Sequence, residues 1–170
     1  MIFKFLSKNF YISFSIVSLI YFLDRLSKIY VIQLDKNNLG SEIFNSTYLN
    51  IVLIWNKGIA FGLLSFNESN LYNILSLIIS IIVVILVVMS LKSQGFKRYS
   101  LLMIVGGALG NLHDRIFFNA VPDFIDFHVG NFHWFIFNVS DIFITLGVIG
   151  MIILEVVENK TEKKNNDKKY

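Results

Sequence analysis

Acidic and amide side chains occur inside or beside the long apolar segments of this chain, where such residues are costly and usually functional. In chain order they are Asp24, Asn111, Asp114, Asp123, Asp126, Asn138 and Asp141. Two carboxylates held together in a medium of low dielectric cannot both ionise cheaply, so one pKa rises and the pair shares a proton. Aspartic proteases activate water with such a pair, and nearby asparagines would hold it without neutralising its charge. Carboxylate acid–base chemistry is therefore the first possibility to consider.

Other catalytic chemistries find less support. The absence of cysteine excludes disulfides, thiolate metal sites and a cysteine nucleophile. A serine nucleophile is disfavoured because no serine stands at a useful spacing from a lysine or histidine; Ser140, beside Asp141, should face another side of its helix. The three histidines, His113, His128 and His133, form no i,i+4 pair. We therefore predict interfacial or loop positions for them, no metal site and no cofactor.

The chain is too apolar to be a soluble domain of its length. Of its 170 residues 55% are hydrophobic and 16% are charged, and the mean hydropathy is +0.62. A membrane-spanning helix needs roughly 20 mostly apolar residues. Four segments meet that requirement, at about 11–32, 71–91, 99–118 and 135–157. The first contains three charged residues and is followed by no small-residue cleavage motif, so we expect a retained helix and no cleaved signal peptide.

Lysine and arginine set the expected orientation, because cytoplasmic loops are enriched in them. Ten of the fifteen lie in the N-terminus, the second connection and the C-terminal tail: Lys4, Lys8, Lys92, Lys97, Arg98, Lys160, Lys163, Lys164, Lys168 and Lys169. The first and third connections hold only Lys36 and Lys57. We therefore predict cytoplasmic termini, one membrane domain over residues 1–159, and a charged, disordered cytoplasmic tail over 160–170.

The first connection, at about 33–70, is too long to be a simple turn. Its segment TYLNIVLIW has the β-branched and aromatic content of a strand, and Gly58 and Gly62 would permit turns or bulges. The fold class expected is therefore a membrane all-α protein: a four-transmembrane-helix bundle with a small outward-facing β-sheet cradle between the first and second helices.

This topology brings the polar groups to the outer membrane level and leaves the cytoplasmic halves apolar. Asp24 and Lys28 are spaced i,i+4 on one helix face, which favours a structural ion pair. Gly106 and Gly110 form a small-xxx-small pattern that allows close approach of another helix.

The third and fourth spans each present a polar face at that same level. Asn111, Asp114 and Arg115 share one face of the third span. Asn138 and Asp141 share a face of the fourth, with Thr145 one turn further on. Asp114 and Arg115 are open to a structural role or to direct contact with a substrate, whereas Asp123 and Asp141 are the strongest candidates for a proton-sharing pair.

Three classes of function remain open at this point. Buried carboxylates also serve proton- or cation-coupled transporters, but those usually have repeated halves and a site near the membrane midplane. A non-catalytic membrane scaffold would not require the outward Asp–Asn pairs. A carboxylate-dependent hydrolase accounts for the pairing best.

Five motifs in order resemble the signal peptidase II (lipoprotein signal peptidase) family. They are DRLSK (24–28), NKGIAF (56–61), GGALGNLHDR (106–115), VPDFID (121–126) and FNVSD (137–141). The resemblance extends over the chain to about residue 157. It implies a bacterial inner-membrane aspartyl endopeptidase that cleaves diacylglyceryl-modified prolipoproteins just before the lipidated cysteine. Membrane lipid and the family's cyclic-peptide inhibitors are the other partners implied, and no nucleic acid is expected.

The resemblance also assigns roles to individual positions. Asp123 and Asp141 match the family's catalytic dyad, and four further residues match positions that line the site or hold the dyad: Asn56, Asn111, Arg115 and Asn138. Supporting structural roles are implied for three others: Asp24, Lys28 and Asp114. Two residues depart from the family pattern, Pro122 in place of an aliphatic residue and Ser140 in place of alanine. Both are small, and we expect activity to be retained.

Overall fold

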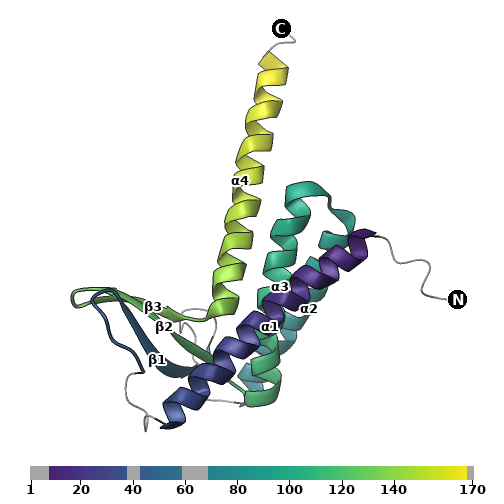
Figure 1. Cartoon of the computed structure of the whole chain (residues 1–170). Coiled ribbons are helices and arrows are strands. Elements are labelled where there is room, and N and C mark those ends of the chain that lie inside the picture. The colour runs from purple at the N-terminus through teal and green to yellow at the C-terminus, as the bar shows by residue number, and fades with distance from the viewer. Residues whose placement is uncertain (1–7, 38–42, 59–68, 168–170) are drawn as a thin grey trace, which may run out of the picture.

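Four long helices dominate the computed structural model, which describes residues 8–37, 43–58 and 69–167 (Figure 1). They are α1 (Lys8–Asn37), α2 (Ser69–Lys92), α3 (Gly95–Phe118) and α4 (Val139–Asp167). Each contains a stretch long and apolar enough to cross a membrane. The four predicted spans are thereby confirmed. The predicted disorder of the tail is wrong as far as Asp167, because α4 continues to that residue.

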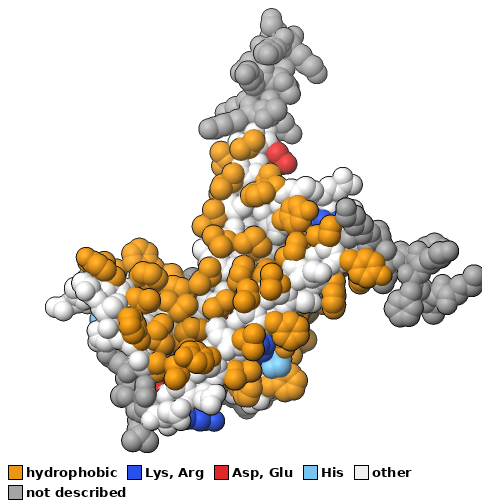
Figure 2. All heavy atoms as spheres, viewed as in Figure 1, with side chains coloured by type: hydrophobic (Ala, Val, Ile, Leu, Met, Phe, Trp, Pro, Cys, Tyr) orange, Lys and Arg blue, Asp and Glu red, His pale blue; other side chains and the backbone are white. Residues whose placement is uncertain are grey.

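Helix α3 is the central helix of the bundle and packs against α1, α2 and α4. Its apolar window has the lowest hydropathy of the four, 1.2, and is also the most enclosed, with 50% of it buried. The most apolar window, in α2, is only 11% buried. Polar residues are therefore concentrated on the helix that other helices cover. Apolar side chains cover the outer surfaces, as expected for contact with lipid (Figure 2).

Glycines let the neighbouring helices approach α3 closely. A Cβ on Gly106 would meet the Ile20 side chain of α1 at 2.9 Å, and one on Gly110 would meet Asp24 at 2.6 Å. A Cβ on Gly107 would overlap the backbone of Ser140 in α4. The predicted packing role of the Gly106–Gly110 pattern is confirmed, and Gly107 extends it to α4.

A three-stranded antiparallel sheet, in the order β1-β2-β3, completes the fold. The strands are β1 (Leu49–Asn56), β2 (Val121–Val129) and β3 (Phe132–Phe137). A two-residue turn joins β2 to β3, and its Gly130 has φ +59, which suits a tight hairpin. The sheet lies at the end of the bundle opposite to the α2–α3 connection and the N-terminal end of α1 (Figure 1).

The small sheet agrees with expectation, but its origin differs in one respect. Only β1 comes from the first connection; β2 and β3 come from the segment between α3 and α4, which was expected to be a short connection. The fourth helix begins at Val139 and not near 135. The run FHWFIF (132–137) is apolar except for His133, and hydropathy cannot distinguish such a strand from the start of a helix.

Candidate active site

Two carboxylates from different elements line one cavity of about 460 Å³. Asp123 comes from β2 and Asp141 from the first turn of α4. Asn56, Asn111 and Arg115 line the same cavity. The sequence-predicted dyad and three of its four predicted supports are therefore brought together, and the fourth, Asn138, contacts both carboxylates.

The position of Asp123 depends on how β2 pairs with β1. Asp123 is paired with Ile54, and a bulge in β1 between Ile51 and Ile54 adds one residue opposite this part of β2. Bulges commonly re-aim side chains beside active sites. The carboxylate is 4% exposed and accepts two hydrogen bonds, from Asn56 Nδ2 at 2.9 Å and from Asn138 Nδ2 at 2.6 Å.

Pro122 fits this strand although β2 is the central one of the sheet. Proline lacks an N–H and is normally confined to edges of sheets. Pairing with β3 begins only at Ile125, so at Pro122 the strand has a single neighbour, Trp55 of β1. Pro122 is fully buried and its ring restricts the backbone immediately before Asp123.

Asp141 is held by a reciprocal cap at the start of α4. The Asp141 N–H donates to Asn138 Oδ1 at 3.2 Å, and the Asn138 N–H donates to Asp141 Oδ2 at 3.1 Å. This is the geometry of a capping box, with Asn as N-cap and Asp three residues later. The other oxygen, Oδ1, accepts a bond from Asn111 Nδ2 at 2.8 Å. The same interactions that begin the helix therefore fix the carboxylate, at a helix end that favours negative charge.

Asn138 links the two acids, because its side chain donates to Asp123 while its backbone donates to Asp141. Burial first, and then the nearby carboxylate of Asp141, raise the pKa of Asp123 from its usual 3.8 to about 6. The hydrogen bonds from Asn56 and Asn138 act in the opposite direction, because they stabilise the charged form. This environment suits proton transfer near neutral pH.

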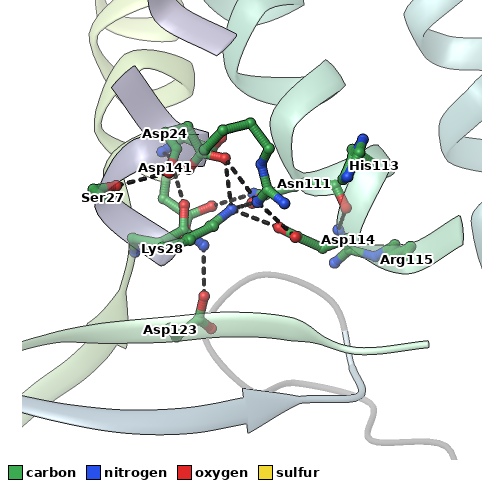
Figure 3. Close-up of polar contacts among 12 residues, drawn as sticks. Asp24, Ser27, Lys28, Asn111, His113, Asp114, Arg115, Asp123 and Asp141 are labelled. Atoms are coloured by element: carbon green, nitrogen blue, oxygen red, sulfur yellow. Dashed lines mark hydrogen bonds and ion pairs between the residues drawn. The ribbon is translucent and has the colours of Figure 1, made fainter. Parts of the chain in front are cut away.

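A buried ionic network lies behind the dyad (Figure 3). The Lys28 ammonium uses its three donors on Asp24 Oδ2 at 2.9 Å, Asn111 Oδ1 at 2.9 Å and Asp114 Oδ2 at 2.7 Å. Arg25 pairs with the carboxylates of Asp24 and Asp114, so two positive and two negative charges balance within the network. Lys28 thereby orients the Asn111 amide, so that its Nδ2 is directed to Asp141.

Asp24 also fastens α1 to the start of α4. Its Oδ1 accepts a hydrogen bond from the Ser140 N–H at 3.0 Å, and Ser140 is fully buried against Gly110. Ser140 therefore faces a different side of α4 from Asp141, as predicted, and only a small side chain fits there. Neither Asp24 nor Asp114 is among the residues that line the cavity, which agrees with a supporting role for both.

Arg115 has the structural role considered for it, and its direct contact with a substrate stays a prediction. Its Nη2 donates to the Gly58 carbonyl at 3.1 Å, which ties the first connection to α3, and its Nη1 donates to the Asn111 carbonyl at 3.2 Å. The side chain also lines the cavity.

A second cavity of about 410 Å³ adjoins the first, since Asp141 and Thr145 line both. Its walls are almost entirely apolar, and the remaining lining residues are Phe127, Trp134, Phe135, Phe137, Ile142 and Leu146. Sequence reasoning did not find this cavity, because Phe135 and Phe137 of β3 were expected in the fourth membrane-spanning helix.

The histidines separate into two groups. His113 Nδ1 and the Tyr21 hydroxyl share a hydrogen bond of 2.8 Å that links α3 to α1. His128 and His133 form a cross-strand pair on the β2–β3 hairpin, and His133 Nδ1 lies 2.8 Å from Asp126 Oδ2. The i,i+4 test applied to the sequence suits helices and does not detect a pair that a hairpin creates.

Comparison with known proteins matches the chain to one protein family. Residues 16–157 match the family model described as "Signal peptidase (SPase) II". The chain is 45% identical to a lipoprotein signal peptidase of Pelagibacter ubique over 161 residues, which cover 95% of this chain and 96% of that protein. It is 41% identical to the corresponding Anaplasma phagocytophilum protein over 137 residues, 79% of this chain and 85% of that one.

Solved structures agree with these sequence matches. A bacterial membrane enzyme determined by the in meso method at 2.3 Å resolution superposes with a TM-score of 0.71 at 28% identity, over 88% of this chain and 90% of that one. A second, at 1.9 Å resolution, has a TM-score of 0.68 at 31% identity, over 84% and 90%.

Proposed function

The chain belongs to the signal peptidase II family, and from this premise we propose that it is an aspartyl endopeptidase whose catalytic pair is Asp123 and Asp141. Family membership makes it a multi-pass bacterial membrane protease that removes signal peptides from prolipoproteins. The aspartyl mechanism, the site of cleavage and the orientation in the membrane are the steps that the proposal adds.

One observation carries the mechanism: Asp123 and Asp141 line the same cavity and are bridged by Asn138. A pair that shares one proton can act on both reactants of the hydrolysis, the water and the scissile peptide bond. One carboxylate takes a proton from water, whose oxygen attacks the scissile carbonyl carbon, while the protonated partner donates to the carbonyl oxygen. Collapse of the tetrahedral intermediate breaks the C–N bond: the carboxylic acid that received the water proton gives it to the leaving amine, and the other carboxylate takes back a hydroxyl proton as the C=O bond re-forms. No acyl-enzyme forms on this route.

The apolar cavity supports the proposal that the substrate is lipid-modified. It adjoins the dyad at Asp141 and is walled by aromatic and aliphatic side chains that can contact acyl chains. With the diacylglyceryl group of the substrate cysteine held there, the peptide bond just before that cysteine would lie at the dyad. Binding remote from the reacting bond would thus select the bond to be cleaved.

The distribution of basic residues supports the proposed orientation in the membrane. The basic residues Lys92, Lys97 and Arg98 lie around the α2–α3 connection, at the end of the bundle opposite to the sheet (Figure 1). By the positive-inside rule that end and both termini face the cytoplasm, and the dyad and sheet face outward.

The test is cleavage of a precursor by purified enzyme in detergent, with and without the diacylglyceryl group on its cysteine. We expect cleavage of the lipidated precursor alone, a product whose first residue by mass spectrometry is the lipidated cysteine, and inhibition by a cyclic-peptide inhibitor of the family. Equal cleavage of the unlipidated precursor would contradict the role of the apolar cavity, and a different first residue would contradict the proposed position.

A further inference from the structure

A group of three potential metal ligands lies on the β2–β3 hairpin, outside the residues that line the two cavities. Asp126 and His128 come from β2 and His133 comes from β3. One ligand atom of each lies within 4.8 Å of those of the other two. The imidazole rings stack with centroids 4.9 Å apart and planes 19° apart, and His133 Nδ1 is 2.8 Å from Asp126 Oδ2.

Two polar atoms of this group are buried without a partner. Asp126 is only 5% exposed, and its Oδ1 has no hydrogen-bond partner among the described residues. The same is true, within that part of the chain, of His128 Nδ1. Buried acceptors and donors are normally satisfied, because leaving one unpaired costs about 1–3 kcal/mol. A carboxylate oxygen and an imidazole nitrogen that lack partners among the described residues, beside a second imidazole, match the donor set of a metal site.

We propose that Asp126, His128 and His133 bind one divalent transition-metal ion of the zinc type, with water completing the coordination. Two imidazoles and one carboxylate are a ligand set that zinc accepts, whereas calcium and magnesium prefer oxygen ligands alone. Bonds of about 2.0–2.2 Å to one ion require a small movement of the ligand atoms, which now lie within 4.8 Å of one another. His133 can make that movement, because 53% of its side chain is exposed, and the same exposure provides the path of entry.

The metal would clamp the hairpin and would take no part in the hydrolysis. It would join β2 to β3 at the end where Gly130 makes the turn, and β3 continues into the aromatic wall of the apolar cavity. Asp126 is in the same strand as Asp123, so the clamp would also limit movement of the strand that carries one catalytic carboxylate. This role does not depend on the proposed catalytic mechanism.

The experiment is a metal titration of the purified full-length protein in detergent, with any polyhistidine tag removed. Zn²⁺ binding is measured by calorimetry, and Co²⁺ binding by its visible absorption. We expect one ion per chain, with affinity at least roughly tenfold weaker in each of His128→Ala, His133→Ala and Asp126→Asn, since even outer-shell losses cost about 10–100-fold. His113→Ala is the matched control, because the third histidine of the chain lies on α3, and it should bind as the wild type does.

The wild-type titration alone can overturn the proposal, if no stoichiometric ion binds. Unchanged affinity in the hairpin variants would also overturn it, as would loss of binding in Asp123→Asn or Asp141→Asn in their place. Because His133 is exposed and, within the described residues, its side chain hydrogen-bonds to Asp126 at the surface of the hairpin, His133→Ala should fold, which thermal unfolding followed by circular dichroism will establish.

Discussion

Replacing Asn138 by serine separates the two functions of this side chain. Its Oδ1 caps α4 by accepting a bond from the Asp141 N–H, and its Nδ2 donates to Asp123 Oδ1 at 2.6 Å. Serine is as good an N-cap as asparagine, but it is too short to reach Asp123. Asn138→Ser should therefore preserve the start of the helix and remove one of the two amide donors to Asp123.

The expected size of the effect follows from the burial of this contact. Asn138 is fully buried, and a hydrogen bond to a charged group contributes about 1.5–3 kcal/mol. At about 1.4 kcal/mol per factor of ten, its loss favours protonation of Asp123 by roughly ten- to a hundredfold, so the pKa of Asp123 rises above its present value of about 6. The direction is upward because the lost donor stabilised the carboxylate and not the carboxylic acid.

The assay is kcat as a function of pH on a lipidated precursor. If Asp123 is the base, the acid limb of the profile moves to higher pH; if it is the proton donor, the basic limb moves to higher pH. Either shift supports the reasoning and assigns the role, whereas an unmoved profile or a shift to lower pH would refute it. Asn138→Ala is the matched variant, since it also removes the cap and should be about 0.5–2 kcal/mol less stable than Asn138→Ser.

Three further predictions concern the frame around the dyad and its orientation. Lys28→Met leaves two buried carboxylates, Asp24 and Asp114, without their shared ammonium and should destabilise the fold by about 3–5 kcal/mol, measured by thermal unfolding. The control is Lys36→Met, on the exposed last turn of α1, which should leave the stability unchanged. Gly110→Ala places a methyl group against α1 and α4 and should cost about 1–3 kcal/mol; an unchanged melting temperature would contradict the close packing. Because the chain has no cysteine, single-cysteine variants report orientation with an impermeant thiol reagent: in intact spheroplasts Gly130→Cys should react, and Lys97→Cys should react only after lysis.

Much of the site could be predicted because it depends on helix periodicity and membrane depth. The i,i+4 spacing of Asp24 and Lys28 does produce an ion pair, at 2.9 Å. The shared polar face of α3 does direct Asn111 towards both Lys28 and Asp141. These relations hold within one helix or between helices of known direction, so the sequence alone contains them.

The hairpin could not be predicted in the same way. Its strands pair through contacts between positions on either side of a turn, and the mostly apolar sequence of β3 resembles a helix start. Predicting where α4 begins was therefore necessary to find three features: the aromatic cavity, the cross-strand histidines and the N-cap role of Asn138. The turn at Gly130-Asn131 was the one local signal that could have revealed the hairpin.

The central claim is that Asp123 and Asp141 perform the hydrolysis together. The most direct measurement is the single-turnover cleavage rate of a lipidated precursor by the wild type, Asp123→Asn and Asp141→Asn, each confirmed as folded by thermal unfolding. Each substitution keeps the size of the side chain and removes its acid–base function, so each should lower the rate by at least roughly 10²–10⁴-fold. A folded variant of either kind that cleaves within tenfold of the wild-type rate would contradict the claim.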